Sequence, residues 1–130
     1  NLLQSAMRHP LVTNQIEMSL KQIAPFTNGD LAFHQQHGHL VMAWSPLGGG
    51  DLMTASNELT HRLDSIATRS GVDRAAVATA FLLAHPAKIT PVLGTNNLDR
   101  ISAISVAETV QLDRQDWFSL YEAALGSEVP

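Results

Sequence analysis

The sequence predicts an α/β protein in which parallel strands alternate with outer helices. Three short apolar or β-branched segments of strand length recur along the chain, and amphipathic segments of helical length lie between them. Apolar strands that are joined by helices form parallel sheets with right-handed crossovers. A closed (β/α)₈ (TIM) barrel needs eight strands and about 250 residues. The 130 residues therefore correspond to roughly the C-terminal half of such a barrel.

The composition excludes several classes of protein. Hydrophobic residues make up 45% of the chain and charged residues 15%, which excludes intrinsic disorder. The net charge of -4 provides no basic face for nucleic acid, and the longest apolar run, residues 75–84, is too short for a membrane span. The absence of cysteine excludes disulfides and thiolate zinc sites. We therefore expect no nucleic-acid or membrane partner, and a reducing, cytoplasmic location.

The first third of the chain carries two predicted strands. Leu2, Leu3, Ala6 and Met7 fall on one face of a helix that ends at His9-Pro10. No initiator methionine precedes it, so we expect a chain whose N-terminal half is missing. The segment 11–17 contains the β-branched residues Val12, Thr13 and Ile16 and predicts a strand. The continuous apolar run 40–44 predicts a strand that is buried on both faces. The segment 31–36 between them predicts a helix, with Gly38 at its C-terminal end.

The rest of the chain predicts helices around one further strand. The segment Ser45-Pro46-Leu47-Gly48-Gly49-Gly50 ends the second strand, because proline lacks a donor and glycine admits positive φ. Helical periodicity and caps then predict, in order, helices over 57–69 and 74–85 (capped by Asp73), a strand over 89–93, a helix over 99–107, and a last helix between Asp113 and Gly126.

The loop after the third strand has the composition of an anion site. In parallel α/β proteins, ligands bind at the carboxyl ends of the strands, which here are the loops after Glu17, Trp44 and Leu93. The segment Gly94-Thr95-Asn96-Asn97, followed by Arg100, offers N–H groups and a guanidinium at a helix N-terminus, where phosphate binds well. The alternative is an ordinary strand–turn–helix in which Asn97 caps the helix and Arg100 is solvated.

Two further positions leave alternatives open. Trp44, at the end of the second strand, either presents its ring to an aromatic ligand or is a core aromatic at the barrel rim. Gln15 and Glu17 lie on the same side of the first strand and point either into the barrel mouth or toward a helix. We interpret the nearby histidines, His34 and its neighbours at 37 and 39, as a solvated helix end rather than a metal site.

Taken together, three segments resemble the last three barrel strands of the aldo-keto reductase superfamily. They are Asn14-Gln15-Ile16-Glu17, Ala43-Trp44-Ser45-Pro46-Leu47-Gly48, and Pro91-Val92-Leu93-Gly94-Thr95 with Arg100. Their order and spacing both fit, and the resemblance covers essentially residues 1–130. The C-terminal segment 117–126 is similar to a bacterial, YdhF-like group of that superfamily.

The resemblance implies a barrel that binds NADPH and reduces carbonyl compounds to alcohols. By position, Gln15 would hydrogen-bond the nicotinamide carboxamide, and Trp44 would stack on the nicotinamide ring. Ser45, Pro46, Leu47 and Gly48 would follow the pyrophosphate. Gly94 begins the loop in which Thr95, Asn96, Asn97 and Arg100 would bind the adenosine 2′-phosphate. Many members of the family have a lysine at the position of Gly94 and a Glu-Asn pair near Ala103 and Ile104, so the preference for NADP over NAD rests on fewer contacts here.

The resemblance implies no catalytic residue within this chain. The family's Asp, Tyr, Lys and His tetrad lies on earlier strands. The single tyrosine here, Tyr121, lies in the last predicted helix, and Lys21 and Lys88 flank helices. We therefore expect a reductase as the parent protein, a small carbonyl compound as its substrate, and an inert isolated chain. We also expect the missing barrel half, or another chain, to cover the open sheet edge. The alternative function is a non-catalytic nucleotide-binding or assembly module.

Overall fold

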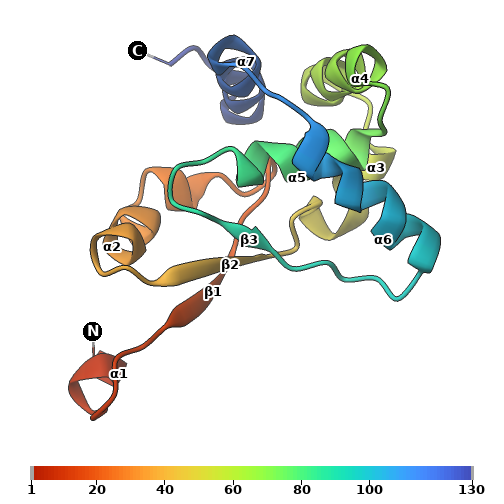
Figure 1. The fold of residues 1–130 in the computed structure, drawn as a ribbon. Helices are drawn as coiled ribbons and strands as arrows, with labels where there is room; N and C mark the ends of the chain where they lie inside the picture. Colours follow the sequence, from red (N-terminus) through yellow and green to blue (C-terminus); the bar gives the residue numbers. More distant parts are fainter. Residues whose placement is uncertain (1, 130) are drawn as a thin grey trace.

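A computed structural model describes residues 2–129 and shows a three-stranded parallel sheet with helices against one of its faces (Figure 1). The strands are β1 (Thr13–Glu17), β2 (Leu40–Trp44) and β3 (Thr90–Pro91), and they lie side by side in that order. The predicted parallel α/β architecture is confirmed. Within the described residues no further strand pairs with the outer edge of β1 or of β3.

Seven helices and three short 3₁₀ turns connect and cover the strands over residues 2–129. The helices are α1 (Leu2–Ser5), α2 (Asp30–Gln36), α3 (Asp51–Thr54), α4 (Glu58–Ser70), α5 (Arg74–Leu83), α6 (Leu98–Ser105) and α7 (Arg114–Leu125), and the 3₁₀ turns are Ala24–Phe26, Gly48–Gly50 and Val106–Thr109. Among these residues, no helix combines the length and the apolar character that crossing a membrane would require.

Some boundaries differ from those predicted. The third strand shrinks from 89–93 to Thr90–Pro91, because Pro91 has no N–H to donate, although the Val92 N–H still donates to the Ala43 carbonyl at 2.8 Å. The first strand begins at Thr13 rather than Leu11. The helix predicted over 99–107 spans Leu98–Ser105 and then tightens into a 3₁₀ turn.

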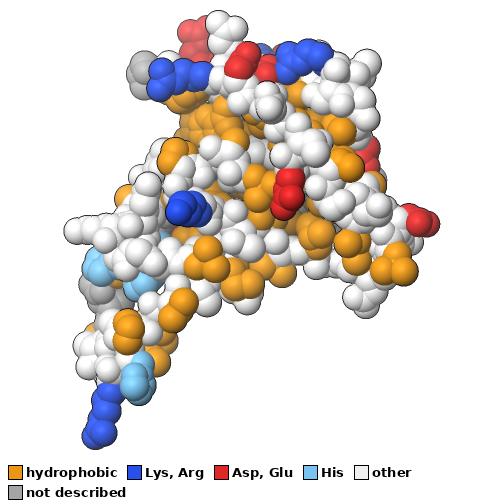
Figure 2. Space-filling view, viewed as in Figure 1, with side chains coloured by type: hydrophobic (Ala, Val, Ile, Leu, Met, Phe, Trp, Pro, Cys, Tyr) orange, Lys and Arg blue, Asp and Glu red, His pale blue; other side chains and the backbone are white. Residues whose placement is uncertain are grey.

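The two faces of the sheet differ in their burial. Val41 and Ala43 are fully buried beneath the helices. The register pairs Gln15 with Met42 and Glu17 with Trp44, so these four side chains share the opposite face, which no helix within residues 2–129 covers. We call this the open face. Figure 2 shows hydrophobic side chains exposed over the strands and beside α6.

Helix α5 forms the centre of the core. Its residues 75–82 are all buried, because β3 lies on one side of it and α4 and α6 lie on others (Figure 1). Phe81 is fully buried and stacks on Trp117 of α7 with 4.6 Å between ring centroids, while the Trp117 indole N–H donates to the Phe81 carbonyl. This packing holds the C-terminal part of α5, and the N-terminus of the helix lies beside the loop that follows β2.

Local capping explains where the longer helices begin and end. Asp73 accepts a hydrogen bond from the Ala76 N–H, and Asp113 forms a reciprocal capping box with Asp116. Gly126 ends α7 with φ 79°, a left-handed conformation that suits glycine. These three predicted boundaries are confirmed.

Candidate functional site

A pocket of about 940 Å³ lies at the carboxyl ends of β2 and β3. Its volume is at the upper end of the range for small-molecule and cofactor sites. The pocket is lined by the end of β2, the loop after it, the loop after β3, and the first turns of α5 and α6: Trp44, Ser45, Pro46, Leu47, Gly49, Gly50, Met53, Asp73, Ala75, Val92, Leu93, Gly94, Thr95, Asp99, Arg100, Ala103 and Ile104.

The structure brings most of the predicted site residues to this one pocket. Seven of the eleven line it, namely Trp44, Ser45, Pro46, Leu47, Gly94, Thr95 and Arg100. The other four, which are Gln15, Gly48, Asn96 and Asn97, are not among its lining residues. Two loops that are far apart in sequence therefore form a single cavity, with an aromatic ring from one and a guanidinium from the other.

Trp44 borders the pocket from the open face of the sheet. Within the described residues it is 41% exposed on this face. Gln15 also lies on the open face, at the position that pairs with Met42, two residues before Glu17 pairs with Trp44. The side chain of Gln15 therefore shares a face with Trp44, although it is not among the residues that line the pocket. It points away from the helices.

The loop after β2 has an unusual backbone. Ser45 has φ 50°, and the three glycines Gly48, Gly49 and Gly50 have φ values of 62°, 66° and 97°. A non-glycine residue in this left-handed region costs about 1–3 kcal/mol unless its surroundings hold it. The turn is closed by the Gly48 N–H, which donates to the Ser45 carbonyl at 2.8 Å. Strain of this kind is common at ligand sites.

The loop after β3 has the helix cap and the exposed arginine that the strand–turn–helix alternative predicts. Asn97 caps α6 by accepting a hydrogen bond from the Arg100 N–H at 3.1 Å, and Thr95 Oγ1 accepts one from the Asn97 N–H. The exposed side chain of Arg100 lines the pocket and forms no ion pair within residues 2–129. The pocket wall formed by α6 thus carries a capped N-terminus and an available cation, which together suit an anionic ligand.

Sequence reasoning missed two acidic groups of the pocket. Asp73 and Asp99 both line it, at the N-termini of α5 and α6. Asp73 is recognisable from sequence as a helix cap, but its place in the pocket depends on how α5 packs against the loop after β2. The lining therefore carries two carboxylates and one guanidinium.

The histidines lie near the opposite, amino-terminal ends of the strands. His34 is buried in α2, where its Nε2 lies 3.0 Å from Nδ2 of Asn14 and its Nδ1 lies 3.1 Å from Nδ1 of His39. Burial, together with the neighbouring His39, lowers the pKa of His34 below its ordinary value. Across residues 2–129, no group of three histidine or carboxylate side chains is arranged to hold a metal ion.

A reductase of this kind needs a tyrosine that donates a proton and a lysine beside it, and neither residue type lines the pocket. Tyr121 is nearly buried in α7 and stacks on Trp117 with 5.4 Å between ring centroids. Lys21 forms an ion pair with Asp51, and Lys88 precedes β3 at the amino-terminal end of the sheet. The described residues thus form a binding pocket without a proton donor of this kind.

Comparison with known proteins places the chain in a family. Residues 2–124 match the Aldo/keto reductase family. A 6-dehydroglucose reductase of Agrobacterium fabrum is 57% identical over 130 residues, which cover 99% of this chain and 44% of that protein. The oxidoreductase YdhF of Escherichia coli is 36% identical over 132 residues, with 99% and 44% covered. The chain thus spans less than half the length of these relatives.

Solved structures share the fold. The thermostable aldo-keto reductase Tm1743, solved with the inhibitor epalrestat, superposes with a TM-score of 0.82 at 23% identity, over 92% of this chain and 42% of that one. An aldo-keto reductase from Klebsiella pneumoniae, solved in complex with NADPH, gives a TM-score of 0.71 at 21% identity, over 84% and 38%. The chain belongs to the aldo/keto reductase family and has the fold of part of its barrel.

Proposed function

We propose that this chain forms the cofactor-binding part of an NADPH-dependent reductase that converts an aldehyde or ketone to an alcohol. The observation that carries the proposal is the single pocket that has Trp44 on one wall and Arg100 on another. The pocket's volume of about 940 Å³ suits a large ligand, and its lining contains a ring for stacking, a loop of small residues and a cation. These features match the three chemical parts of a nicotinamide dinucleotide phosphate.

Each part of the pocket has a proposed role. Trp44 stacks on the nicotinamide and Gln15 binds its carboxamide from the open face. Ser45, Pro46, Leu47 and Gly48 follow the pyrophosphate. The segment 94–97 and Arg100 bind the 2′-phosphate, where Arg100 provides the positive charge. When bound, the cofactor supplies the hydride for the reduction.

The proton for the reduced oxygen comes from outside the described pocket. Tyr121 packs among aromatic rings in the core, and neither lysine reaches the pocket lining. We therefore propose that the preceding half of the barrel supplies the acid and covers the open face, where Leu40 and Trp44 are each about two-fifths exposed. We further propose a cytoplasmic enzyme, and 6-dehydroglucose, named in the 57% identical relative, is the first carbonyl substrate to test.

The test replaces Arg100 in the complete protein and measures cofactor affinity by tryptophan fluorescence. A hydrogen bond to a charged group contributes about 1.5–3 kcal/mol, so Arg100→Met should weaken NADPH binding about 10- to 150-fold. NADH lacks the 2′-phosphate, so its affinity should change little. Arg114, exposed at the start of α7 and absent from the pocket lining, provides the control substitution Arg114→Met, which should leave both affinities unchanged.

Two outcomes would contradict the proposal. If Arg100→Met lost the same affinity for NADPH and for NADH, Arg100 would not bind the 2′-phosphate. Binding of NADPH without any reduction of carbonyl compounds by the complete protein would favour a non-catalytic nucleotide-binding module.

A further inference from the structure

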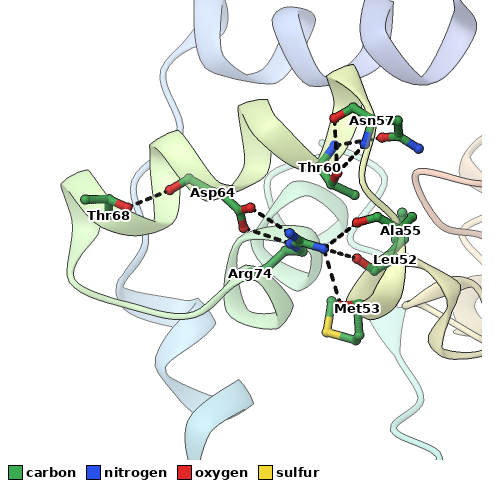
Figure 3. Close-up of polar contacts among 8 residues, drawn as sticks. All are labelled: Leu52, Met53, Ala55, Asn57, Thr60, Asp64, Thr68 and Arg74. Atoms are coloured by element: carbon green, nitrogen blue, oxygen red, sulfur yellow. Dashed lines mark hydrogen bonds and ion pairs between the residues drawn. The ribbon is translucent and has the colours of Figure 1, made fainter.

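Arg74 makes the densest set of polar contacts in the described part of the chain. It is the first residue of α5, and its guanidinium forms a two-pronged ion pair with Asp64 of α4, at 2.7 Å from Nε and 2.6 Å from Nη2 (Figure 3). Its remaining nitrogen, Nη1, donates to the main-chain carbonyls of Leu52 at 2.9 Å and Ala55 at 3.1 Å, with Met53 at 3.4 Å. The side chain is only 20% exposed.

Two of these carbonyls, those of Leu52 and Met53, belong to helix α3, and the third belongs to Ala55, which follows the helix. The helix cannot satisfy them itself. Helix α3 has four residues, and the last four carbonyls of any helix lack partners within the helix. Arg74 therefore acts as a C-terminal cap that is supplied from 19 to 22 residues away in sequence. Asp64 holds the guanidinium flat against these carbonyls, and the same contact lowers the pKa of Asp64.

The segment held in this way is the wall of the proposed cofactor pocket. Residues 44–47, 49, 50 and 53 line the pocket, and the wall contains three consecutive glycines with positive φ. Glycine-rich loops lose much conformational entropy when they are ordered. Besides Arg74, the ion pair that ties this segment to the rest of the chain joins Lys21 to Asp51, and both of those side chains are more than half exposed. Exposed ion pairs contribute little to the free energy of folding.

We propose that Arg74 is a positioning residue for cofactor binding, because its guanidinium fastens residues 45–55 to α4 and α5 and keeps the pocket wall in its binding shape. The inference rests on the proposed function of the pocket. Arg74 itself is absent from the pocket lining, so its effect is transmitted through the wall. A protein whose pocket wall is already ordered binds its cofactor more tightly. The apparent dissociation constant rises as the fraction of molecules with the binding-competent wall falls.

The experiment compares Arg74→Met with Arg62→Met in the complete protein. Arg62 is a matched control, because its guanidinium also bonds a carboxylate, Glu58, and main-chain and side-chain oxygens of Ser119, and it ties α4 to α7 away from the pocket. Each variant is tested for thermal stability, for the dissociation constant of NADPH, for kcat at saturating cofactor, and for hydrogen exchange of the amides in residues 48–55.

Arg74→Met should raise the dissociation constant for NADPH about tenfold, which corresponds to a fall in the competent fraction from nearly one to about one tenth. Exchange at residues 48–55 should become faster by more than tenfold, because the open fraction rises from close to zero to about nine tenths. The kcat at saturating NADPH should stay near that of the unmodified protein. Arg74→Lys, which keeps the charge but not the planar fork, should give an intermediate result. Arg62→Met should lower stability without changing NADPH affinity or exchange in this segment.

The outcomes separate this inference from the proposed function. If the unmodified protein does not bind NADPH, the proposed function fails. If it binds NADPH and Arg74→Met binds it equally well, or if both arginine variants lose affinity in proportion to their loss of stability, the positioning role of Arg74 is wrong.

Discussion

Two adjacent glycines allow a steric effect to be separated from a backbone effect. Gly48 and Gly49 both have positive φ, at 62° and 66°. A Cβ at Gly48 would lie 3.2 Å from both Cβ and Cδ of Lys21, whereas a Cβ at Gly49 would meet nothing within 4 Å. The substitutions Gly48→Ala and Gly49→Ala therefore share the backbone cost and differ in the contact with Lys21.

The magnitudes follow from these contacts. An alanine in the left-handed region costs about 1–2 kcal/mol, which applies to both variants. Overpacking costs about 1–3 kcal/mol. The lower value applies at Gly48, since the Lys21 side chain is 57% exposed and its exposed ion pair with Asp51 resists a small shift only weakly, while its Cβ is fixed to the main chain. Gly48→Ala should therefore destabilise the protein by about 1 kcal/mol more than Gly49→Ala does.

Urea denaturation of the complete protein measures this difference. With a typical slope of about 2 kcal/mol per molar urea, the midpoint of Gly48→Ala should lie roughly 0.5 M below that of Gly49→Ala. Equal midpoints, or a lower midpoint for Gly49→Ala, would show that the contact between Gly48 and Lys21 does not constrain this loop.

Two further predictions concern pH dependence and the core. Burial lowers the pKa of His85 below 6.5, so the unfolded chain takes up the proton more readily and stability should fall as pH drops below 6.5. His85→Asn keeps an acceptor for the Ala87 N–H and should reduce this fall, as seen in thermal unfolding between pH 7 and about 5. An unchanged pH profile would contradict the role of His85 and assign the effect to the buried His34. Phe81→Ala removes a fully buried ring that stacks on Trp117 and should cost about 3–5 kcal/mol in urea denaturation, and a loss below about 2 kcal/mol would contradict the core assignment.

The candidate site was predictable to the extent that its parts are local. The cap formed by Asn97 depends on neighbouring residues, and the structure shows it, whereas residues 94–97 are extended loop without a main-chain turn. The participation of Asp73 and Asp99 in the pocket was not predictable, because it depends on two helix N-termini meeting the loop after β2. Helix α3 was also missed, since four residues are too few to show helical periodicity, and its terminal carbonyls are satisfied by Arg74.

By itself, the sequence determined the alternation of strands and helices and the main helix boundaries at Asp73, Asp113 and Gly126, because periodicity and capping act over a few residues. Tertiary structure decided which face carries Gln15 and Trp44, and it brought the loops after β2 and β3 into one pocket. The physical reason is that strand register and helix packing join residues far apart in the chain, and no local pattern encodes such contacts.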